Sequence, residues 1–395
     1  MTVIRAPLAS IWSRVCKFFA LPSRFASVER VKSYRVTEEP DFYKRGGFHP
    51  IFLRHRKYVA LKVLRADCYG GSHDIFEKEI LLKIRDISAK SSHQGRHHMS
   101  GLLDHFQERG PNGDHICFVF DVLGHHLDFQ TAKYEDGKLP VTAVKLISRQ
   151  LLLGLDFLHR ECGVIHTDLK PTNILLELEN ANDAVAHYLS AVPPRMHHRR
   201  DVATPLREVI STPLISEMQE PRVKIIDFGV ASWKEKHLTE LIQSPALRAP
   251  EVTIGASWDV GVDIWSLGCL IVELIQGIVL FSGQASSRGS WTAEDDHLAR
   301  IIEVLGPFPL DFIKKGSRAS EFFDEEGNLR RIPNMKSTSL ERLINGTTKP
   351  FLKPRDMADA DVPVFVDFLK GMLTIDPRSR KSAAELLQHD WIKPG

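Results

Sequence analysis

The chain is short of cysteine, of long apolar runs and of net charge. Its 395 residues include five scattered cysteines without a C-x-x-C pair, which predicts free thiols in a reducing compartment rather than a disulfide framework. No apolar run approaches the roughly 20 residues of a membrane span, so no transmembrane helix is expected. A net charge of +2 neither indicates nor excludes a nucleic-acid partner, and we expect no direct nucleic-acid binding. What remains is the composition of an ordinary globular protein, 43% hydrophobic and 26% charged, large enough for two lobes or two domains.

The first 30 residues lack an acidic side chain before Glu29. They carry basic residues together with apolar residues at helical spacing, namely Ile11, Trp12, Val15, Phe18 and Phe19. This composition resembles a mitochondrial presequence, which makes residues 1–42 a basic segment and a candidate targeting signal. The alternatives are a basic, partly disordered tail and a mis-assigned start.

A polar loop between two apolar runs is the most informative stretch. Residues 164–165 and 174–176 would be buried as short strands, and Asp168, Lys170 and Asn173 lie between them. This arrangement resembles the catalytic loop of eukaryotic protein kinases. The resemblance implies that Asp168 accepts a proton from a substrate hydroxyl, Lys170 neutralises charge on the γ-phosphate and Asn173 holds Mg²⁺. The alternative is a buried strand–turn–strand with incidental polar residues.

A lysine in an apolar strand forms a second motif with the helix that follows it. Residues 58–64 alternate and are rich in β-forming residues, which predicts a strand carrying Lys62. Because its neighbours are apolar, Lys62 needs an anionic partner, and the helical pattern over 74–85 offers Glu77 or Glu79. We favour Glu77, since apolar residues follow it at three, four and seven positions, whereas Glu79 has a lysine at the fourth.

Later segments complete an ordered series of motifs. Strands are predicted over 101–106 and 115–120, a helix over 144–160, and a buried strand that leads into Asp227-Phe228-Gly229. An A-P-E triplet follows at 249–251. Periodicity fades before the D-F-G motif, which predicts an inserted, mobile segment at about 178–221.

From about Tyr43 to Trp391 the chain resembles the protein kinase superfamily and, within it, the SR-protein kinases. The superfamily marks, in order, are Lys62, Glu77, Asp168-Lys170-Asn173, Asp227-Phe228-Gly229, Ala249-Pro250-Glu251 and Asp263. The narrower marks are residues 46–50, residues 122–127 and His166-Thr167-Asp168, with a segment at 295–306 shared with the neighbouring LAMMER kinases. The resemblance implies an α+β, bilobal protein kinase fold, with a truncated β-rich small lobe at 43–121 and a mainly helical large lobe at 122–392.

The resemblance also implies ATP and Mg²⁺ as cofactors. Lys62, paired with Glu77, would anchor the α- and β-phosphates, and Asp227 would share Mg²⁺ with Asn173. Adenine would meet backbone groups of Asp121 and Leu123 at the hinge between the lobes, with Phe120 walling the pocket. Glu251 would pair with Arg380, and Asp263 would brace the catalytic loop.

The implied activity is ATP-dependent serine/threonine phosphorylation of Arg/Ser-rich proteins, a step in the regulation of mRNA splicing. By motif match, Asp296 and Glu303 occupy docking-groove positions for such basic substrates. They lie seven residues apart and so share one helix face; the alternative is an ordinary solvated face. We expect a monomer in the cytoplasm and nucleus, with the mitochondrion as the alternative.

Thr167 stands where most kinases carry an arginine that binds a phosphorylated activation loop. Threonine cannot form that charged pair. We therefore expect activity without activation-loop phosphorylation, and unchanged turnover when Ser244 and Thr239 are replaced by alanine.

One expected motif is missing from the sequence. No G-x-G-x-x-G precedes Lys62, although the backbone of such a loop normally cradles the phosphates. Three explanations stay open: an incompletely defined gene or splice form of an active kinase, a kinase with weakened ATP binding, and a pseudokinase that acts as a scaffold for basic peptides. Thr172 is a smaller departure, because glutamate is usual there.

Overall fold

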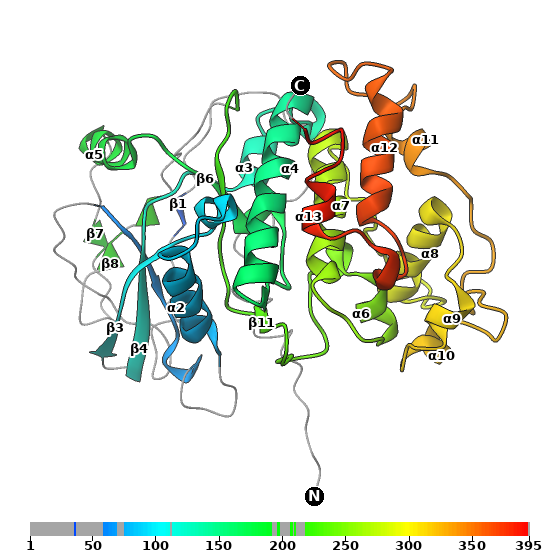
Figure 1. Ribbon diagram of the computed structural model, residues 1–395, viewed down its shortest axis with the longest axis horizontal. Helices are drawn as coiled ribbons and strands as arrows, with labels where there is room; N and C mark the ends of the chain where they lie inside the picture. The colour runs from blue at the N-terminus through cyan, green and yellow to red at the C-terminus, as the bar shows by residue number, and fades with distance from the viewer. Residues whose placement is uncertain are drawn as a thin grey trace, which may run out of the picture.

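The protein folds into two lobes of different composition (Figure 1). This computed structural model describes residues 35–36, 58–68, 75–110, 113–191, 196–197, 206–207, 209–210 and 218–393. A small lobe contains an antiparallel sheet and helix α2 (Glu77–Ser88), and a larger lobe is mainly helical. The α+β, bilobal architecture expected from the sequence is confirmed.

The small-lobe sheet has the strand order β2-β4-β3, all antiparallel, among the described residues. Its strands are β2 (Ala60–Val63), β3 (Leu102–Gly110) and β4 (Gly113–Phe120). The three predicted strands and the helix beside them are therefore confirmed, with bounds shifted by a few residues. The stretch before Lys62 where a glycine-rich loop would stand falls at residues 37–57, outside the described residues.

A short linker after α2 fastens the small lobe to helix α4 (Val141–Asp156). The backbone of Gly95 approaches α4 so closely that a Cβ atom there would lie 1.9 Å from the carbonyl oxygen of Leu153, which only glycine permits. Beside it, His93 Nε2 lies 2.9 Å from Asp156 Oδ2. Since α2 carries Glu77, this attachment helps to fix the position of Glu77 relative to the large lobe.

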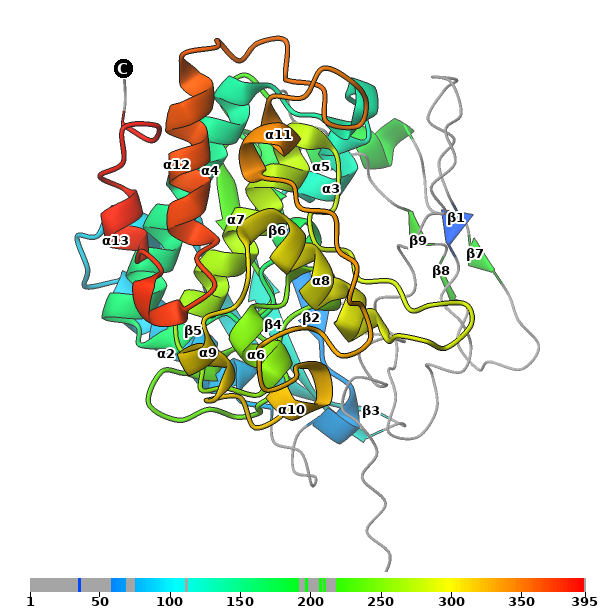
Figure 2. The same cartoon turned by 90° about the vertical axis from the view of Figure 1, so that its right-hand side faces the viewer.

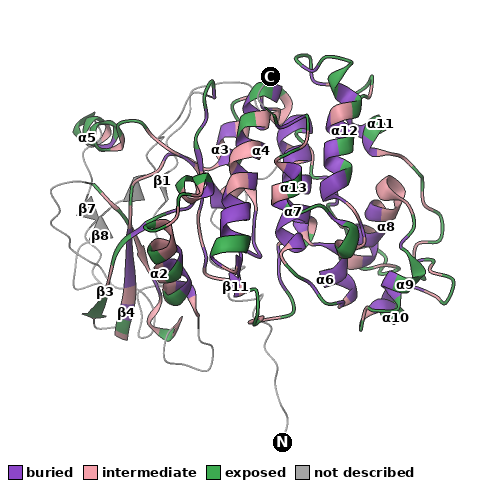
Figure 3. Cartoon of the chain, viewed as in Figure 1, coloured by how far each residue is buried: buried purple, intermediate pink, exposed green. Residues whose placement is uncertain are grey.

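The core of the large lobe is built on α4, α7 (Gly261–Gln276) and α12 (Asp361–Met372), which are largely buried (Figure 3). The first of these corresponds to the helix predicted over 144–160. Helices α8 to α10 gather at the end of this lobe far from the sheet (Figure 1), and they lie toward the viewer in Figure 2. Further helices and strands are α3 (Leu127–Thr131), α6 (Pro250–Ile254), α8 (Ala293–Leu305), α9 (Leu310–Ile313), α10 (Ala319–Phe322), α11 (Leu340–Ile344), α13 (Ala383–Leu386), β5 (Val164–Ile165), β6 (Ile174–Leu176), β10 (Val223–Ile225) and β11 (Ser232–Trp233). In the described part of the chain no helix has the length and apolar character to cross a membrane.

The segment at 178–221 contains a helix that the sequence did not predict. Helix α5 (Ala181–Ala191) is rich in alanine and carries Asp183 in its first turn, and both features favour a helix. Three short strands follow, β7 (Met196–His197), β8 (Leu206–Arg207) and β9 (Val209–Ile210), and β9 pairs with β1 (Arg35–Val36). The predicted boundaries of the lobes and of the insertion stay predictions, since several of them fall near residues outside the described set.

Candidate active site

The catalytic loop is held between two short strands. β5 and β6 flank it, and β6 pairs with β10, which leads into the D-F-G motif. The Asp168 carboxylate accepts three side-chain hydrogen bonds: from Lys170 Nζ at 2.6 Å and Asn173 Nδ2 at 3.3 Å to Oδ2, and from Ser244 Oγ at 2.9 Å to Oδ1. Asp168 is only 8% exposed, so these bonds fix the direction of its carboxylate.

Asp263, near the start of α7, anchors the backbone of this loop. Its carboxylate is buried and accepts hydrogen bonds from the backbone N–H groups of His166 and Thr167, each at 2.8 Å. Burial alone would raise its pKa, but His159 at 2.8 Å and these donors hold the pKa of Asp263 below its ordinary value. The bracing role implied by the resemblance is therefore matched by these contacts.

Lys62 contacts two carboxylates, one from the small lobe and one from the large lobe. Its Nζ lies 2.5 Å from Glu77 Oε1 and 2.7 Å from Asp227 Oδ1. Burial would lower the pKa of Lys62, yet the two neighbouring carboxylates raise it above its ordinary value, so the amine stays charged. Burial likewise opposes ionisation of Asp227, but the ammonium of Lys62 holds the pKa of Asp227 below its usual range. The ion pair predicted between Lys62 and Glu77 is present.

The D-F-G segment lies directly against the catalytic loop. The Ile226 N–H donates to the Asn173 carbonyl at 3.0 Å, which sets Asp227 beside the loop. The Asn173 side chain points its nitrogen at the Asp168 carbonyl, at 2.9 Å, which leaves its amide oxygen as a possible metal ligand. An ionised carboxylate and an amide oxygen are oxygen donors that suit a hard cation, so this pair fits a divalent metal held with a nucleotide.

The pairing of Lys62 gives a direct test of the choice between two glutamates. We expect Glu77→Gln to lower kcat/KM for ATP about 10- to 100-fold, because the buried negative charge that pairs with Lys62 is lost even though the amide oxygen can still accept a hydrogen bond. Glu79→Gln is the matched control, since Glu79 is exposed on the same helix. Steady-state kinetics of both variants checks this, and equal losses would contradict the assignment of Glu77.

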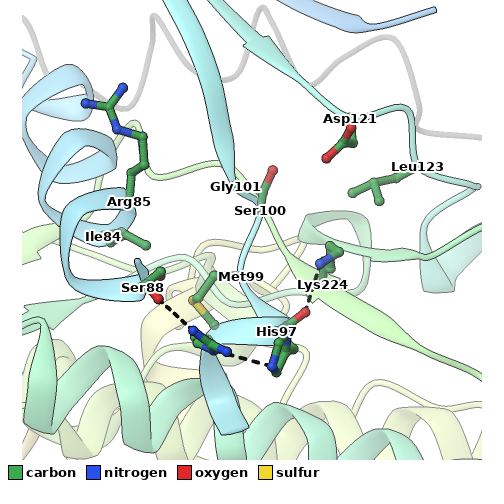
Figure 4. Close-up of a pocket in the computed structure, with 11 residues that line it drawn as sticks. Ile84, Arg85, Ser88, His97, Met99, Ser100, Gly101, Asp121, Leu123 and Lys224 are labelled. Carbon is green, nitrogen blue, oxygen red and sulfur yellow. Dashed lines mark hydrogen bonds between the residues drawn. The ribbon is translucent and has the colours of Figure 1, made fainter. Parts of the chain in front are cut away.

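The hinge side chains Asp121 and Leu123 line a pocket of about 190 Å³ that does not include Lys62, Asp168 or Asp227 (Figure 4). Its other walls come from α2, from the linker after it and from Lys224. Phe120 is the last residue of β4 and lies edge-on to Phe118, with ring centroids 6.4 Å apart. The predicted contacts of adenine with backbone groups of Asp121 and Leu123 stay a prediction.

Ser244 is a site residue that sequence reasoning missed. Its hydroxyl donates to Asp168, as described above, so it belongs to the catalytic cluster and is not simply a potential modification site. The expectation that Ser244→Ala leaves turnover unchanged stays a prediction, but a change in turnover would now also report the loss of this contact with Asp168. Thr239, for which no such contact with Asp168 is recorded among the described residues, remains the suitable position for that test. No signal in the sequence distinguished the two.

The two predicted docking residues lie on α8, remote from the cluster around Asp168 along the chain. Asp296 Oδ2 accepts a hydrogen bond from the Gln284 N–H at 2.7 Å and forms an ion pair with Arg300 at 2.8 Å. Glu303 Oε1 accepts from the Lys336 N–H at 2.8 Å. Both carboxylates therefore already have partners within the chain, and a basic substrate would have to compete with Arg300.

The comparisons with known proteins agree with this geometry. The protein kinase domain family matches residues 51–392, and the chain accordingly belongs to the protein kinases. Protein kinase dsk1 of Schizosaccharomyces pombe is 30% identical, covering 93% of this chain and 86% of that protein. Serine/threonine-protein kinase SRPK of Physarum polycephalum is also 30% identical, at 90% and 91% coverage. SRSF protein kinase 3 of Sus scrofa is 27% identical, at 90% of each chain.

These similarities extend over nearly the whole length of the relatives and not only over shared motifs. Within the protein kinases, the chain is therefore a serine/threonine kinase of the SR-protein kinase family, as the sequence motifs had predicted.

Proposed function

We propose that this kinase transfers the γ-phosphoryl group of ATP to serine side chains of Arg/Ser-rich proteins. The observation that carries the proposal is the network that links these residues: Lys62 Nζ lies 2.7 Å from Asp227, and Asn173 donates to Asp168 and accepts the N–H of Ile226, next to Asp227. In that role Asp168 orients the acceptor hydroxyl and receives its proton, while Lys170, 2.6 Å from Asp168, offsets charge on the phosphoryl group in transfer.

Mg²⁺ is the proposed metal, held by Asn173 and Asp227. When bound, the cation neutralises charge on the phosphate oxygens of the nucleotide. The lowered pKa of Asp227 keeps its carboxylate ionised at neutral pH, as a metal ligand requires. Lys62 is proposed to anchor the α- and β-phosphates, with Glu77 holding its ammonium in place.

The substrate class is supported by the printed names of relatives, such as SRSF protein kinase 3, and by acidic side chains on α8. Asp296 and Glu303 share one face of this helix, and arginine binds carboxylates through strong charged hydrogen bonds. We propose that a basic substrate segment displaces Arg300 from Asp296 when it docks.

The docking proposal predicts an effect on substrate affinity alone. The double variant Asp296→Asn, Glu303→Gln should raise KM for a long Arg/Ser peptide about tenfold with kcat unchanged, since two partly exposed charge contacts are lost. The matched control is Glu325→Gln, Glu326→Gln, which removes the same charge from exposed positions of the same lobe. If the control variant raises KM equally, overall charge and not the proposed docking site is responsible.

Calorimetry tests whether the chain is an enzyme with a working nucleotide site. We expect Mg²⁺·ATP to bind the unaltered chain and binding to weaken at least tenfold in Asp227→Ala, because the variant loses a metal ligand. Asp104→Ala, at an exposed position of β3, should bind as the unaltered chain does. Should no binding be detected to the unaltered chain while it still binds Arg/Ser peptide, the scaffold alternative replaces the kinase proposal.

A further inference from the structure

The pocket shown in Figure 4 has no part in the proposed reaction. It encloses about 190 Å³ and takes five of its lining residues from the linker between α2 and β3, so we call it the linker pocket. Three of the lining side chains are cationic, those of Arg85, Arg96 and Lys224, and one is a carboxylate, that of Asp121. The lining is therefore positive overall, which favours an anionic ligand.

Two of these cations come from different segments and meet at one linker residue, His97. Arg96 Nε lies 3.4 Å from His97 Nε2, and Lys224 Nζ donates to the His97 carbonyl at 2.8 Å. Lys224 also pairs with Glu177 at 3.3 Å, whereas Arg96 forms no ion pair with a carboxylate in the described part of the chain. The contact between Arg96 and His97 is long for a hydrogen bond, so the guanidinium can turn toward a ligand at little cost. Two cations beside one residue suit an oxyanion with two negative charges.

The rest of the linker pocket is largely apolar. Ile84 of α2, Met99 of the linker and Leu123 of the hinge contribute apolar side chains to its wall. Gly101 leaves room beside them, because a Cβ atom built there would have no neighbour within 4 Å. The volume is below the roughly 300–1,000 Å³ typical of sites for drug-sized ligands. The ligand that matches this pocket is therefore small, with an anionic head and a compact apolar body.

The linker pocket also lies where three segments of the candidate active site meet. Its wall on α2 belongs to the helix that carries Glu77, its second wall is the hinge, and Lys224 is the middle residue of β10, which leads to Asp227. Glu77 and Asp227 are the two carboxylates that contact Lys62. A ligand held between Arg96 and Lys224 would bridge the linker after α2 to β10. It would thereby favour the arrangement in which both carboxylates reach Lys62.

From these observations we propose that the linker pocket binds a small organic phosphate monoester and that its occupation strengthens nucleotide binding. The phosphate group contacts Arg96 and Lys224, and the apolar body lies against Ile84 and Leu123. By thermodynamic linkage, the nucleotide strengthens binding of the monoester by the same factor. This coupling rests on the proposed kinase function, whereas binding of the monoester does not.

Calorimetry with three probes tests the class of ligand. Phenyl phosphate carries both parts of the proposed ligand, inorganic phosphate carries only the charged head, and phenol carries only the apolar body. We expect phenyl phosphate to bind the unaltered chain at least tenfold more tightly than either of the other two. If inorganic phosphate binds as tightly as phenyl phosphate, or if phenyl phosphate does not bind, the proposed class of ligand is wrong.

Variants of the lining locate the bound probe. Arg96→Gln should weaken binding of phenyl phosphate at least tenfold, because a charged hydrogen bond to the phosphate is lost. The matched control is Arg222→Gln, which removes the same charge from a mostly exposed position outside the lining and should bind the probe as the unaltered chain does. Equal weakening in the two variants overturns the proposal. Should Arg96→Gln not fold, Gly101→Leu occupies the pocket without removing a polar side chain and is likewise expected to weaken binding at least tenfold.

A second titration, in the presence of a saturating non-hydrolysable ATP analogue and Mg²⁺, tests the coupling. We expect phenyl phosphate to bind about fivefold more tightly than it does without nucleotide. Weaker binding would show that the probe competes for the nucleotide site, which overturns the proposal. Unchanged binding would show that the two sites are independent, which overturns the coupling. If the chain binds phenyl phosphate and no nucleotide, the proposed kinase function fails while the ligand site is supported.

Discussion

Replacing Asp168 by asparagine should lower the rate of phosphoryl transfer about 10²- to 10⁴-fold, the range typical for loss of a positioned general base. The asparagine side chain keeps the shape of the carboxylate but cannot accept a proton from the acceptor hydroxyl. It also loses the charge that Lys170, 2.6 Å away, balances in the present structure. Because Lys62, Glu77 and Asp227 are untouched, the affinity for Mg²⁺·ATP should change little.

Single-turnover kinetics with prebound nucleotide measures the chemical step, and calorimetry measures nucleotide binding in the same variant. Asp104→Asn is the matched control, an identical chemical change at an exposed position of β3, and should retain activity. A variant at Asp168 that turns over within about tenfold of the unaltered enzyme would show that another group accepts the proton.

The candidate active site could be predicted from sequence to the extent that its residues are fixed by local patterns. The choice of Glu77 over Glu79 followed from apolar residues three, four and seven positions later, and these residues, Ile80, Leu81 and Ile84, are buried. A helix that buries this face must turn Glu77 inward, where it meets Lys62. The spacing of apolar residues is a property of a single helix, so it can be recognised in the sequence without knowing which elements pack against that helix.

Contacts that depend on how separate segments pack together could not be predicted from the sequence. The hydrogen bond from Ser244 to Asp168 joins residues 76 positions apart and depends on the left-handed backbone at Gln243. The pairing of Asp296 with Arg300 and with the Gln284 N–H depends on how a loop folds back on α8. Sequence places such residues on a helix face or in a loop, but tertiary structure decides which partner each one finds.

The helix within 178–221 was missed for a different reason. Most side chains of α5 are small or polar, and among those that the structure describes only Val185 is buried. The apolar periodicity that identifies a helix is weak when so little of the surface packs against a core. Alanine-rich composition was the available signal, and it is a weaker one because propensity alone seldom decides a short helix.

Breaking the buried ion pair between Glu251 and Arg380 should lower the stability of the fold strongly. Both side chains are almost fully buried, and the guanidinium binds the carboxylate with two hydrogen bonds of 2.7 and 2.9 Å. Arg380 also donates to the carbonyl of Gly261, the first residue of α7. Arg380→Met should lower the free energy of unfolding by about 3–5 kcal/mol, because the carboxylate of Glu251 is then left buried without its cation.

Urea unfolding followed by fluorescence and by circular dichroism measures the difference, with Arg378→Met as the control. Arg378 is two residues away and mostly exposed, paired with Asp376 at the surface, so its loss should have little effect on unfolding. The double variant Glu251→Leu, Arg380→Met should recover part of the lost stability, since apolar residues can replace a buried ion pair. The double variant could instead lose as much stability as Glu251→Leu and Arg380→Met lose when their separate losses are added. That result would mean that the pair stabilises the protein chiefly through the bond of Arg380 to α7. The contacts of Asp263 with the catalytic loop should then weaken as well.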